Sequence, residues 1–222
     1  RARALLSSQL SIRDARGLLE ELVDSLDDTR TAAGWVLLGD ALTFSDPGEA
    51  RSAYEHARTV DPSSVDARLG LVRLLSSMAL FDAALEVAMD VLEEERLPKD
   101  MLGEVIVTAT DCLHRLRRGD EALILLERAF DEVPAHWRLG CLLVEALARA
   151  ELYGREHARL RTLARRELPP HQLARVCLRI ARLLFSHADQ IELAEQPSNV
   201  EIERHLQRAL SLDPELTEAR EI

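Results

Sequence analysis

The chain has 222 residues, a formal charge of −11 and only 4 % aromatic residues. The acidic total argues against a nucleic-acid-binding protein, because such proteins attract phosphate backbones with positive charge. No run approaches the 18 consecutive apolar residues of a membrane-spanning helix, and no signal peptide opens the sequence. Membrane insertion is therefore not expected, and the expected location is the cytoplasm.

Prolines recur along the chain at regular intervals. Pro62, Pro98, Pro134 and Pro170 are 36 residues apart, and Pro214 follows after a longer gap. Each lies just beyond an apolar pattern of helical period, where proline ends a helix because it lacks an N–H donor. The equal spacing of these helix ends predicts an internal repeat.

The clearest repeat unit is predicted over 32–64. Trp35 and Leu38 lie on one face of its first helix. Asp46 and Pro47 predict the start of a second helix, with Asp46 as the N-cap and Pro47 at the first helical position. The unit is therefore predicted to be a hairpin of two helices.

The apolar and small residues of this unit keep a defined order. They are Trp35, Leu38, Gly39, Leu42, Ala50, Tyr54, Ala57 and Pro62. In this order they resemble the tetratricopeptide repeat, whose pattern has Trp, Leu-Gly and Tyr in the first helix and Ala, an aromatic residue, Ala and Pro in the second. Leu42 stands where Tyr is usual. The resemblance implies an all-α, right-handed solenoid of stacked antiparallel helix pairs.

Two related repeat families have similar periods. The half-a-tetratricopeptide repeat shares the character of residues 49–55, and the pentatricopeptide repeat reads RNA bases, usually through a basic groove. The Leu38-Gly39 pair and the Asp-Pro endings favour the tetratricopeptide repeat. The acidic total disfavours an RNA reader.

Weaker copies of the same pattern fill the rest of the chain, which is predicted to form one solenoid over 1–222. The predicted divisions are a partial unit over 1–31, units over about 32–64, 65–98, 99–136, 137–170 and 171–214, and a partial unit over 215–222. The unit over 171–214 contains an insertion over 186–199. The unit over 137–170 departs from the pattern at Glu156, where alanine is usual.

Residues of catalytic or metal-binding type show no arrangement that indicates a reaction. The seven histidines lack metal-ligand spacing, and the sequence has no glycine-rich phosphate loop. The sequence has no CxxC pair among its three cysteines, Cys112, Cys141 and Cys177. They are interpreted as small apolar side chains of a protein in a reducing compartment. The sequence therefore predicts no enzyme, no metal and no cofactor.

Positive charge is concentrated near the C-terminal units. From Glu151 to Arg182 there are eight arginines and three glutamates. In tetratricopeptide arrays the first helix of each unit lines a concave groove, so the resemblance implies a peptide-binding surface there. The residues predicted to form it are Arg138, Arg149, Gln172, Arg175, Arg179 and Arg182. Spacings of four and three residues also place the last three arginines on one ridge of a helix.

Two interpretations of this arginine ridge stay open. The planar fork of arginine suits bidentate capture of carboxylates, so the ridge is a candidate cradle for an acidic peptide or helix. It also fits the ordinary solvated face of an amphipathic helix. The insertion over 186–199 carries Asp189, Glu192 and Glu195. It is interpreted either as a segment that folds back onto the basic ridge or as a tolerated surface loop.

The function expected from these features is a non-enzymatic scaffold or adaptor that holds a partner's peptide or helix in the groove. The partner is expected to be a protein or peptide, with an acidic segment as one candidate. Two alternatives remain. One is a regulatory or targeting module of a larger enzyme or signalling protein, and the other is an array that self-associates through its exposed ends.

Overall fold

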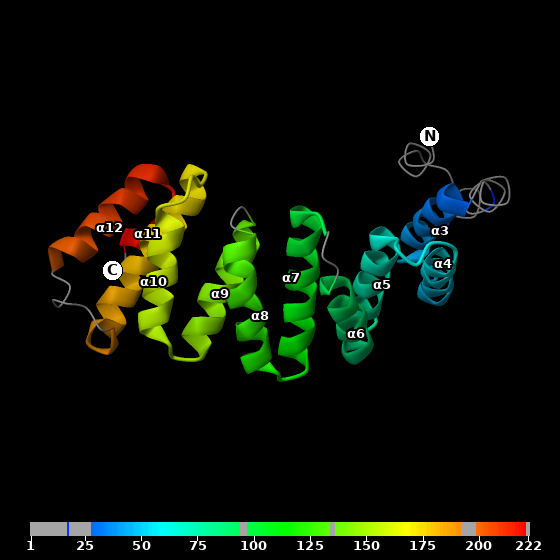
Figure 1. Cartoon of the computed structure of the whole chain (residues 1–222). Coiled ribbons are helices and arrows are strands. Elements are labelled where there is room, and N and C mark those ends of the chain that lie inside the picture. The colour runs from blue at the N-terminus through cyan, green and yellow to red at the C-terminus, as the bar shows by residue number, and fades with distance from the viewer. Residues whose placement is uncertain (1–16, 18–27, 94–96, 134–135, 192–198, 221–222) are drawn as a thin grey trace. The chain divides into compact units, whose positions relative to one another are not determined.

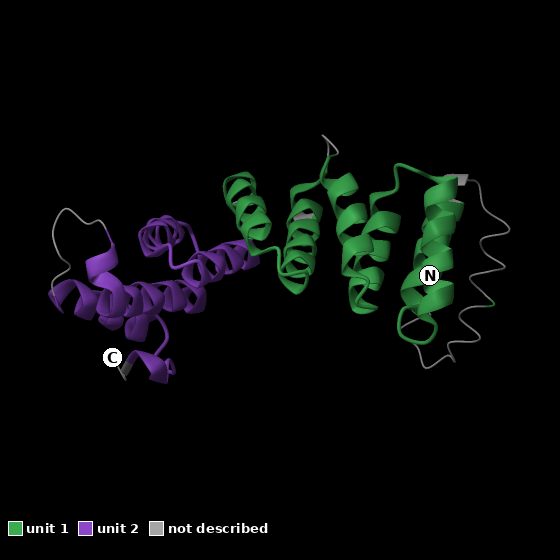
Figure 2. Ribbon diagram, turned by 90° about the horizontal axis from the view of Figure 1, so that it is seen from below, with its two compact units in different colours: residues 1–136 green, residues 137–222 purple. Residues whose placement is uncertain are grey.

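The computed structural model describes residues 17, 28–93, 97–133, 136–191 and 199–220. Within these ranges the chain forms ten α-helices and two short 3₁₀-helices, and no strand occurs there. The all-α helical repeat fold predicted from the sequence is confirmed. The chain divides into two compact units, unit 1 over 1–136 and unit 2 over 137–222 (Figure 2). That all the repeats form one continuous solenoid stays a prediction.

Unit 1 contains three antiparallel helix pairs that follow one another along the chain (Figure 1). They are α3 (Asp28–Leu42) with α4 (Pro47–Val60), α5 (Val65–Ser77) with α6 (Phe81–Leu92), and α7 (Lys99–Arg115) with α8 (Gly119–Glu132). Helix α4 also packs on α5, and α6 packs on α7. Each pair therefore buries apolar surface on the next, and a shared core extends from Leu38 to Ala122.

Tyr54 shows how the helices of unit 1 come into close contact. Its side chain is 2 % exposed and lies against Gly39 of α3 and Gly70 of α5. A Cβ atom on Gly39 would approach Cε1 of the ring to 2.7 Å, and one on Gly70 would collide with the same atom. The Tyr54 hydroxyl donates a hydrogen bond to Asp40 Oδ1 at 2.7 Å. Burial raises the pKa of the phenol, so it stays protonated.

Side-chain caps begin two of these helices. Asp46 is the N-cap of α4, as predicted, and its Oδ1 accepts a hydrogen bond from the Glu49 N–H at 3.0 Å. Pro47 is the first helical residue, where its missing N–H leaves no donor unsatisfied. Ser64 caps α5 in the same way. These short polar residues mark the helix starts in the sequence as well as in the structure.

Unit 2 contains two helix pairs and two 3₁₀-helices. Its elements are α9 (Trp137–Arg149), α10 (Tyr153–Ala164), α11 (Pro170–His187), η1 (Ala188–Gln190), α12 (Asn199–Leu212) and η2 (Thr217–Arg220). Helix α10 packs on both α9 and α11, and α11 packs on α12. Ala219 of η2 joins a buried cluster with Cys177 and Ala209, so η2 adds to the core of the last pair.

The segment that separates α11 from α12 is shorter than the insertion predicted over 186–199. Helix α11 continues to His187, η1 follows directly, and α12 begins at Asn199. Residues 192–198 lie outside the described residues, and so does most of the partial unit predicted over 1–31. The interpretation that Glu192 and Glu195 fold back onto the arginine ridge therefore stays a hypothesis.

Candidate functional site

All six residues predicted to form the peptide-binding surface lie on α9 and α11 of unit 2. Arg138 and Arg149 are near the two ends of α9, and both are exposed. The other four lie along α11 and are Gln172, Arg175, Arg179 and Arg182. None of the six is buried. They differ, however, in whether another residue of the chain already binds them.

Arg179 is bound by a carboxylate from the neighbouring helix. Its Nε donates a hydrogen bond to Oε1 of Glu156 on α10 at 2.7 Å. The Glu156 side chain is 0 % exposed, whereas that of Arg179 is 44 % exposed. The second carboxylate oxygen, Oε2, is buried and has no hydrogen-bond partner. Arg179 is thus the neutralising partner of a buried charge, because an unpaired buried carboxylate would be costly.

Two more of the predicted arginines are also in ion pairs within unit 2. Arg182 Nη2 lies 2.8 Å from Oε2 of Glu218 in η2, with both side chains partly exposed. Arg149 Nη2 lies 3.5 Å from Oε2 of Glu145, one helical turn away on α9. Exposed pairs of this kind hold the side chains only weakly, so a ligand could still displace the partner.

Arg138 and Arg175 remain exposed and make no ion pair with the residues that the structure describes. Arg175 of α11 lies near enough to Cys141 of α9 for its charge to act on the thiol. The exposed surfaces of these two helices are therefore close to each other at this point. Burial raises the pKa of the Cys141 thiol to about 11, with Glu145 adding to the rise and Arg175 opposing it. The thiol is therefore protonated at neutral pH and is no nucleophile.

Sequence reasoning missed a pocket in unit 2. It has a volume of ≈ 580 Å³ and lies along α10, with Gln190 and Ile191 of the inserted segment on its wall. Arg155, His157 and Arg161 also line it. The repeat pattern gave no signal for it, because the departure noted on α10, Glu156, is not among the residues that line the pocket. The contribution of Gln190 and Ile191 could not be predicted, because it depends on tertiary contacts with α10.

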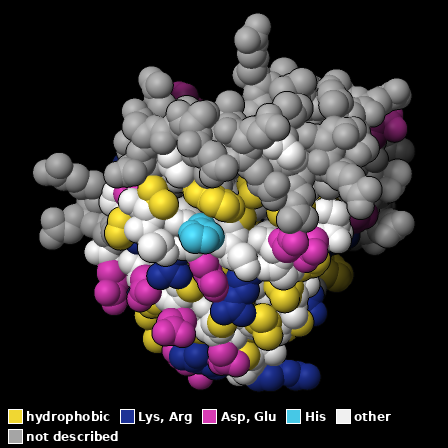
Figure 3. All heavy atoms as spheres, turned by 90° about the vertical axis from the view of Figure 1, so that its right-hand side faces the viewer, with side chains coloured by type: hydrophobic (Ala, Val, Ile, Leu, Met, Phe, Trp, Pro, Cys, Tyr) yellow, Lys and Arg dark blue, Asp and Glu magenta, His cyan; other side chains and the backbone are white. Residues whose placement is uncertain are grey.

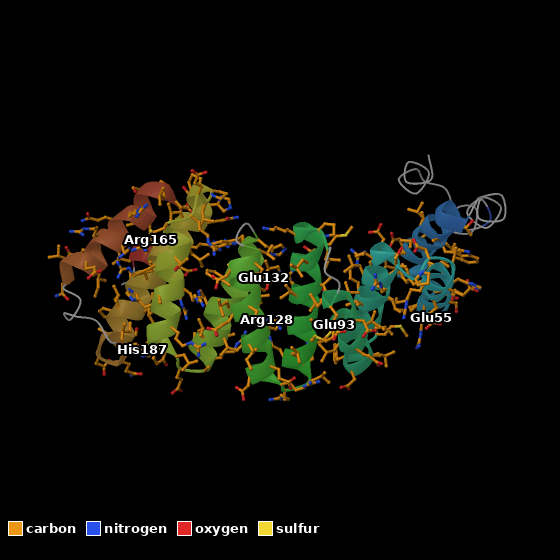
Figure 4. The ribbon with its side chains drawn as sticks, viewed as in Figure 1. Glu55, Glu93, Arg128, Glu132, Arg165 and His187 are labelled. Atoms are coloured by element: carbon orange, nitrogen blue, oxygen red, sulfur yellow. The ribbon has the colours of Figure 1, made fainter. Side chains whose placement is uncertain are left out.

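A second pocket lies in unit 1, between α6 and α8, with a volume of ≈ 290 Å³. Met89 and Ile124 line it and are 42 % and 62 % exposed, although both are apolar. Arg118 at its edge binds Glu121 at 2.6 Å, and Arg128 of α8 is a further lining residue (Figure 4). This pocket is thus mainly apolar with charged residues at its border.

Charge on the α3–α4 end of unit 1 is mixed. In Figure 3 the described part of this face carries acidic and basic side chains side by side, with hydrophobic ones between them. The Arg51–Glu55 pair of α4, at 2.7 Å, is one example of such neutralisation. The described part of this end therefore shows no concentration of arginine like that on the helices of unit 2.

The described residues form neither a metal site nor a membrane-spanning helix. No three histidine, cysteine, aspartate or glutamate side chains there lie close enough together to hold a metal ion. None of the described helices has the length and apolar character needed to cross a membrane. Cys112, Cys141 and Cys177 are all free of disulfide bonds.

Comparison with known proteins relates the chain to one repeat family. Residues 41–100, which include α4, α5 and α6, match the sequence model of the family described as Tetratricopeptide repeat. No curated protein matches the sequence.

Solved structures resemble the chain over most of its length. The C-terminal part of a TPR repeat-containing protein from Cytophaga hutchinsonii has a TM-score of 0.72 at 12 % identity, covering 95 % of this chain and 80 % of that one. PilF from Pseudomonas aeruginosa has a TM-score of 0.62 at 14 % identity, covering 95 % and 88 %. YrrB, described as a TPR protein with an unusual peptide-binding site, has a TM-score of 0.61 at 14 % identity, covering 91 % and 96 %. At these identities the likeness concerns the fold.

Proposed function

Because this chain belongs to the tetratricopeptide repeat family, we propose that it is a non-catalytic scaffold that holds an acidic peptide or helix of a partner protein. The tetratricopeptide repeat fold is in general a protein-interaction scaffold, so protein partners follow from the fold. The finer proposal is that the partner binds across α9 and α11 of unit 2. That YrrB has a peptide-binding site makes a peptide a reasonable class of ligand for this fold.

The observation that carries the proposal is the state of Arg138 and Arg175. Both guanidinium groups are exposed and make no ion pair with the described residues of unit 2. A guanidinium is weakly hydrated and can donate two parallel hydrogen bonds to one carboxylate. Two such groups on helices of one unit therefore favour a ligand that bears carboxylates. Arg179 is a poorer candidate, because Glu156 already occupies it.

A charge-reversal experiment tests this proposal. An acidic amphipathic peptide, labelled with a fluorophore, is titrated with the full chain and with the Arg138→Glu/Arg175→Glu variant. We expect affinity to fall about tenfold or more, and wild-type binding to weaken as salt rises. The control variant, Arg204→Glu/Arg208→Glu, makes the same change in net charge on exposed positions of α12. Arg179→Glu is avoided because it would set a second carboxylate against buried Glu156.

The outcomes separate a specific site from general electrostatics. Equal losses in the two double variants, or no loss in either, would refute the assignment to Arg138 and Arg175. Static light scattering on the same samples measures self-association, which stays a prediction. If the scattering mass rises with protein concentration while the peptide shows no saturable binding, self-association is favoured over peptide binding.

A further inference from the structure

The groove between α6 and α8 in unit 1 is separate from the peptide-binding surface proposed for unit 2. Helices α6 and α8 are the second helices of their pairs, and the first helices of the same pairs, α5 and α7, pack directly on each other. In contrast, α6 and α8 hardly contact each other, and a groove of ≈ 290 Å³ stays open between them. Leu85 of α6 and Leu113 of α7 line this groove and are themselves buried, so they form its floor.

Apolar side chains also line the sides of the groove. Met89 of α6 and Ile124 of α8 are both partly exposed there, next to Leu125. The lining residues of α8 extend from Arg118 to Arg128, which is about 15 Å along the helix axis. An apolar stripe of this length between two helices matches the ridge of side chains that a third helix presents, because helices pack with ridges in grooves.

Carboxylates flank the groove on the α6 side. Helix α6 contains three acidic residues, Asp82, Glu86 and Asp90, and no basic residue. Spacings of four residues place these three on one ridge of the helix, beside Met89. All three are exposed, and none forms an ion pair with the described residues. The protein therefore leaves a row of negative charges uncompensated along this edge.

The α8 side does not neutralise this row. Helix α8 contains five acidic residues and one arginine. Arg118, which precedes it, donates hydrogen bonds to both carboxylate oxygens of Glu121 at 2.6 and 2.7 Å. Arg128 is a further positive charge on the groove, and Glu132 follows it one turn later on α8 (Figure 4). The described charges on the two helices therefore sum to an acidic surface around an apolar groove.

Backbone chemistry and size narrow the class of ligand. The backbone groups of α6 and α8 bond within each helix, so their sides offer no partners to the N–H and C=O groups of an extended peptide. A helical ligand satisfies its own backbone and presents only side chains. The volume of ≈ 290 Å³ is at the lower limit of small-molecule sites, which are about 300–1,000 Å³, and suits a few side chains of a larger partner.

Charge also argues against a second copy of this chain as the ligand. The chain has a formal charge of −11, so two copies repel each other at an acidic surface. A ligand with positive charge beside its apolar stripe complements the same surface.

We propose that the groove between α6 and α8 binds a basic amphipathic helix of a partner protein. Apolar side chains at helical spacing enter the groove between Met89 and Ile124. Lysine or arginine side chains along the edge of the ligand pair with Asp82, Glu86 and Asp90. This ligand has the opposite charge to the one proposed for unit 2, so either proposal can fail without the other.

Titration of the full chain with designed peptides tests the charge and the apolar stripe separately. The probe is a fluorophore-labelled helical peptide of about five turns, with one leucine stripe flanked by lysines. One control has the same composition with its leucines dispersed around the helix, and the other has glutamate in place of lysine. We expect saturable binding of the probe that weakens as salt rises, and at least about tenfold weaker binding of both controls. No saturable binding of the probe, or equally tight binding of either control, would overturn the proposal.

Matched substitutions locate the site on the protein. Ile124→Ser removes an exposed apolar side chain from the groove and is expected to weaken the probe about tenfold. Glu86→Gln/Asp90→Asn is expected to weaken it about fivefold. The control, Asp111→Asn/Glu203→Gln, makes the same change in net charge at exposed positions outside the groove and should leave the affinity unchanged. The proposal is wrong if the control loses as much affinity as the groove variant, or if Ile124→Ser binds like the wild type.

Light scattering without peptide tests a second copy as the ligand. Any self-association is expected to be the same in the wild type and in Ile124→Ser. A dimer of the wild type that Ile124→Ser dissociates would place a second copy in the groove and overturn the proposal.

Discussion

Glu156 occupies a position at which the repeat pattern calls for alanine, between two packed helices. The structure explains how this departure is tolerated. The Glu156 side chain is fully buried, and Arg179 Nε donates a hydrogen bond to it at 2.7 Å. A small residue would let the backbones of α10 and α11 meet directly. Here a salt bridge fills the same place, so Arg179 compensates for the departure at Glu156.

This compensation predicts a rescue at the residue scale. Arg179→Ala should lower the free energy of unfolding by about 2 kcal/mol, because it leaves the Glu156 carboxylate buried and unpaired. The double variant Glu156→Ala/Arg179→Ala should recover most of that loss, since alanine is the residue that the repeat pattern uses. Urea denaturation of the four proteins in the cycle measures the coupling. Additive losses would show that the pair does not act as a unit.

At the element scale, three helices end in the same way. Ala79, Arg117 and Glu151 follow α5, α7 and α9, and their φ angles are 59°, 62° and 57°. The residue after each donates its N–H back into the helix, as Arg118 does to the Leu113 carbonyl at 2.9 Å. This is a Schellman ending, in which glycine is usual because a Cβ atom disfavours positive φ.

Glycine at one of these ends should therefore stabilise the protein. We expect Arg117→Gly to raise the free energy of unfolding by about 0.5 kcal/mol, the relief of strain exceeding the added entropy of the unfolded chain. Arg115→Gly, two residues earlier and still within α7, should instead lower it by about 1 kcal/mol. Urea midpoints compare the two. A loss of stability in Arg117→Gly would contradict this account.

At the scale of the whole molecule, two histidines in unit 2 link stability to pH. Burial lowers the pKa of His157, with Arg161 and His205 acting in the same direction and Glu201 opposing them. Burial also lowers the pKa of His205, with Arg208, Arg204 and Arg161 adding to the effect and Glu201 again opposing it. Below about pH 6.5 the unfolded chain binds protons that the folded chain does not.

Stability should therefore fall as pH drops below about 6.5 toward the lower folded pKa values. Each histidine contributes at most about 1.4 kcal/mol per pH unit over that range. Thermal unfolding at pH 7.5 and 5.5 should show a lower midpoint at the acidic pH. His157→Leu/His205→Leu should reduce the difference between the two midpoints. An unchanged difference in this variant would mean that other groups cause the effect.

The sequence predicted the helices of the repeat better than it predicted the contacts of the candidate site. The start of α4 at Pro47 and its cap by Asp46 follow from neighbouring residues, so local pattern was sufficient. The placement of the ridge arginines on one helix also follows from their spacing. Their partners do not, because Glu156 and Glu218 come from other elements. The spacing of residues along one helix does not determine which charged residue of a neighbouring element contacts them.

The sequence by itself determined the all-α fold and the pairing of its helices. The reason is that helical period, caps and proline ends act over a few residues and repeat along the chain. Only the tertiary structure decided which arginines are already bound and that a pocket opens beside α10. Both depend on contacts between residues distant in sequence, such as Arg179 with Glu156 and Ile191 with α10.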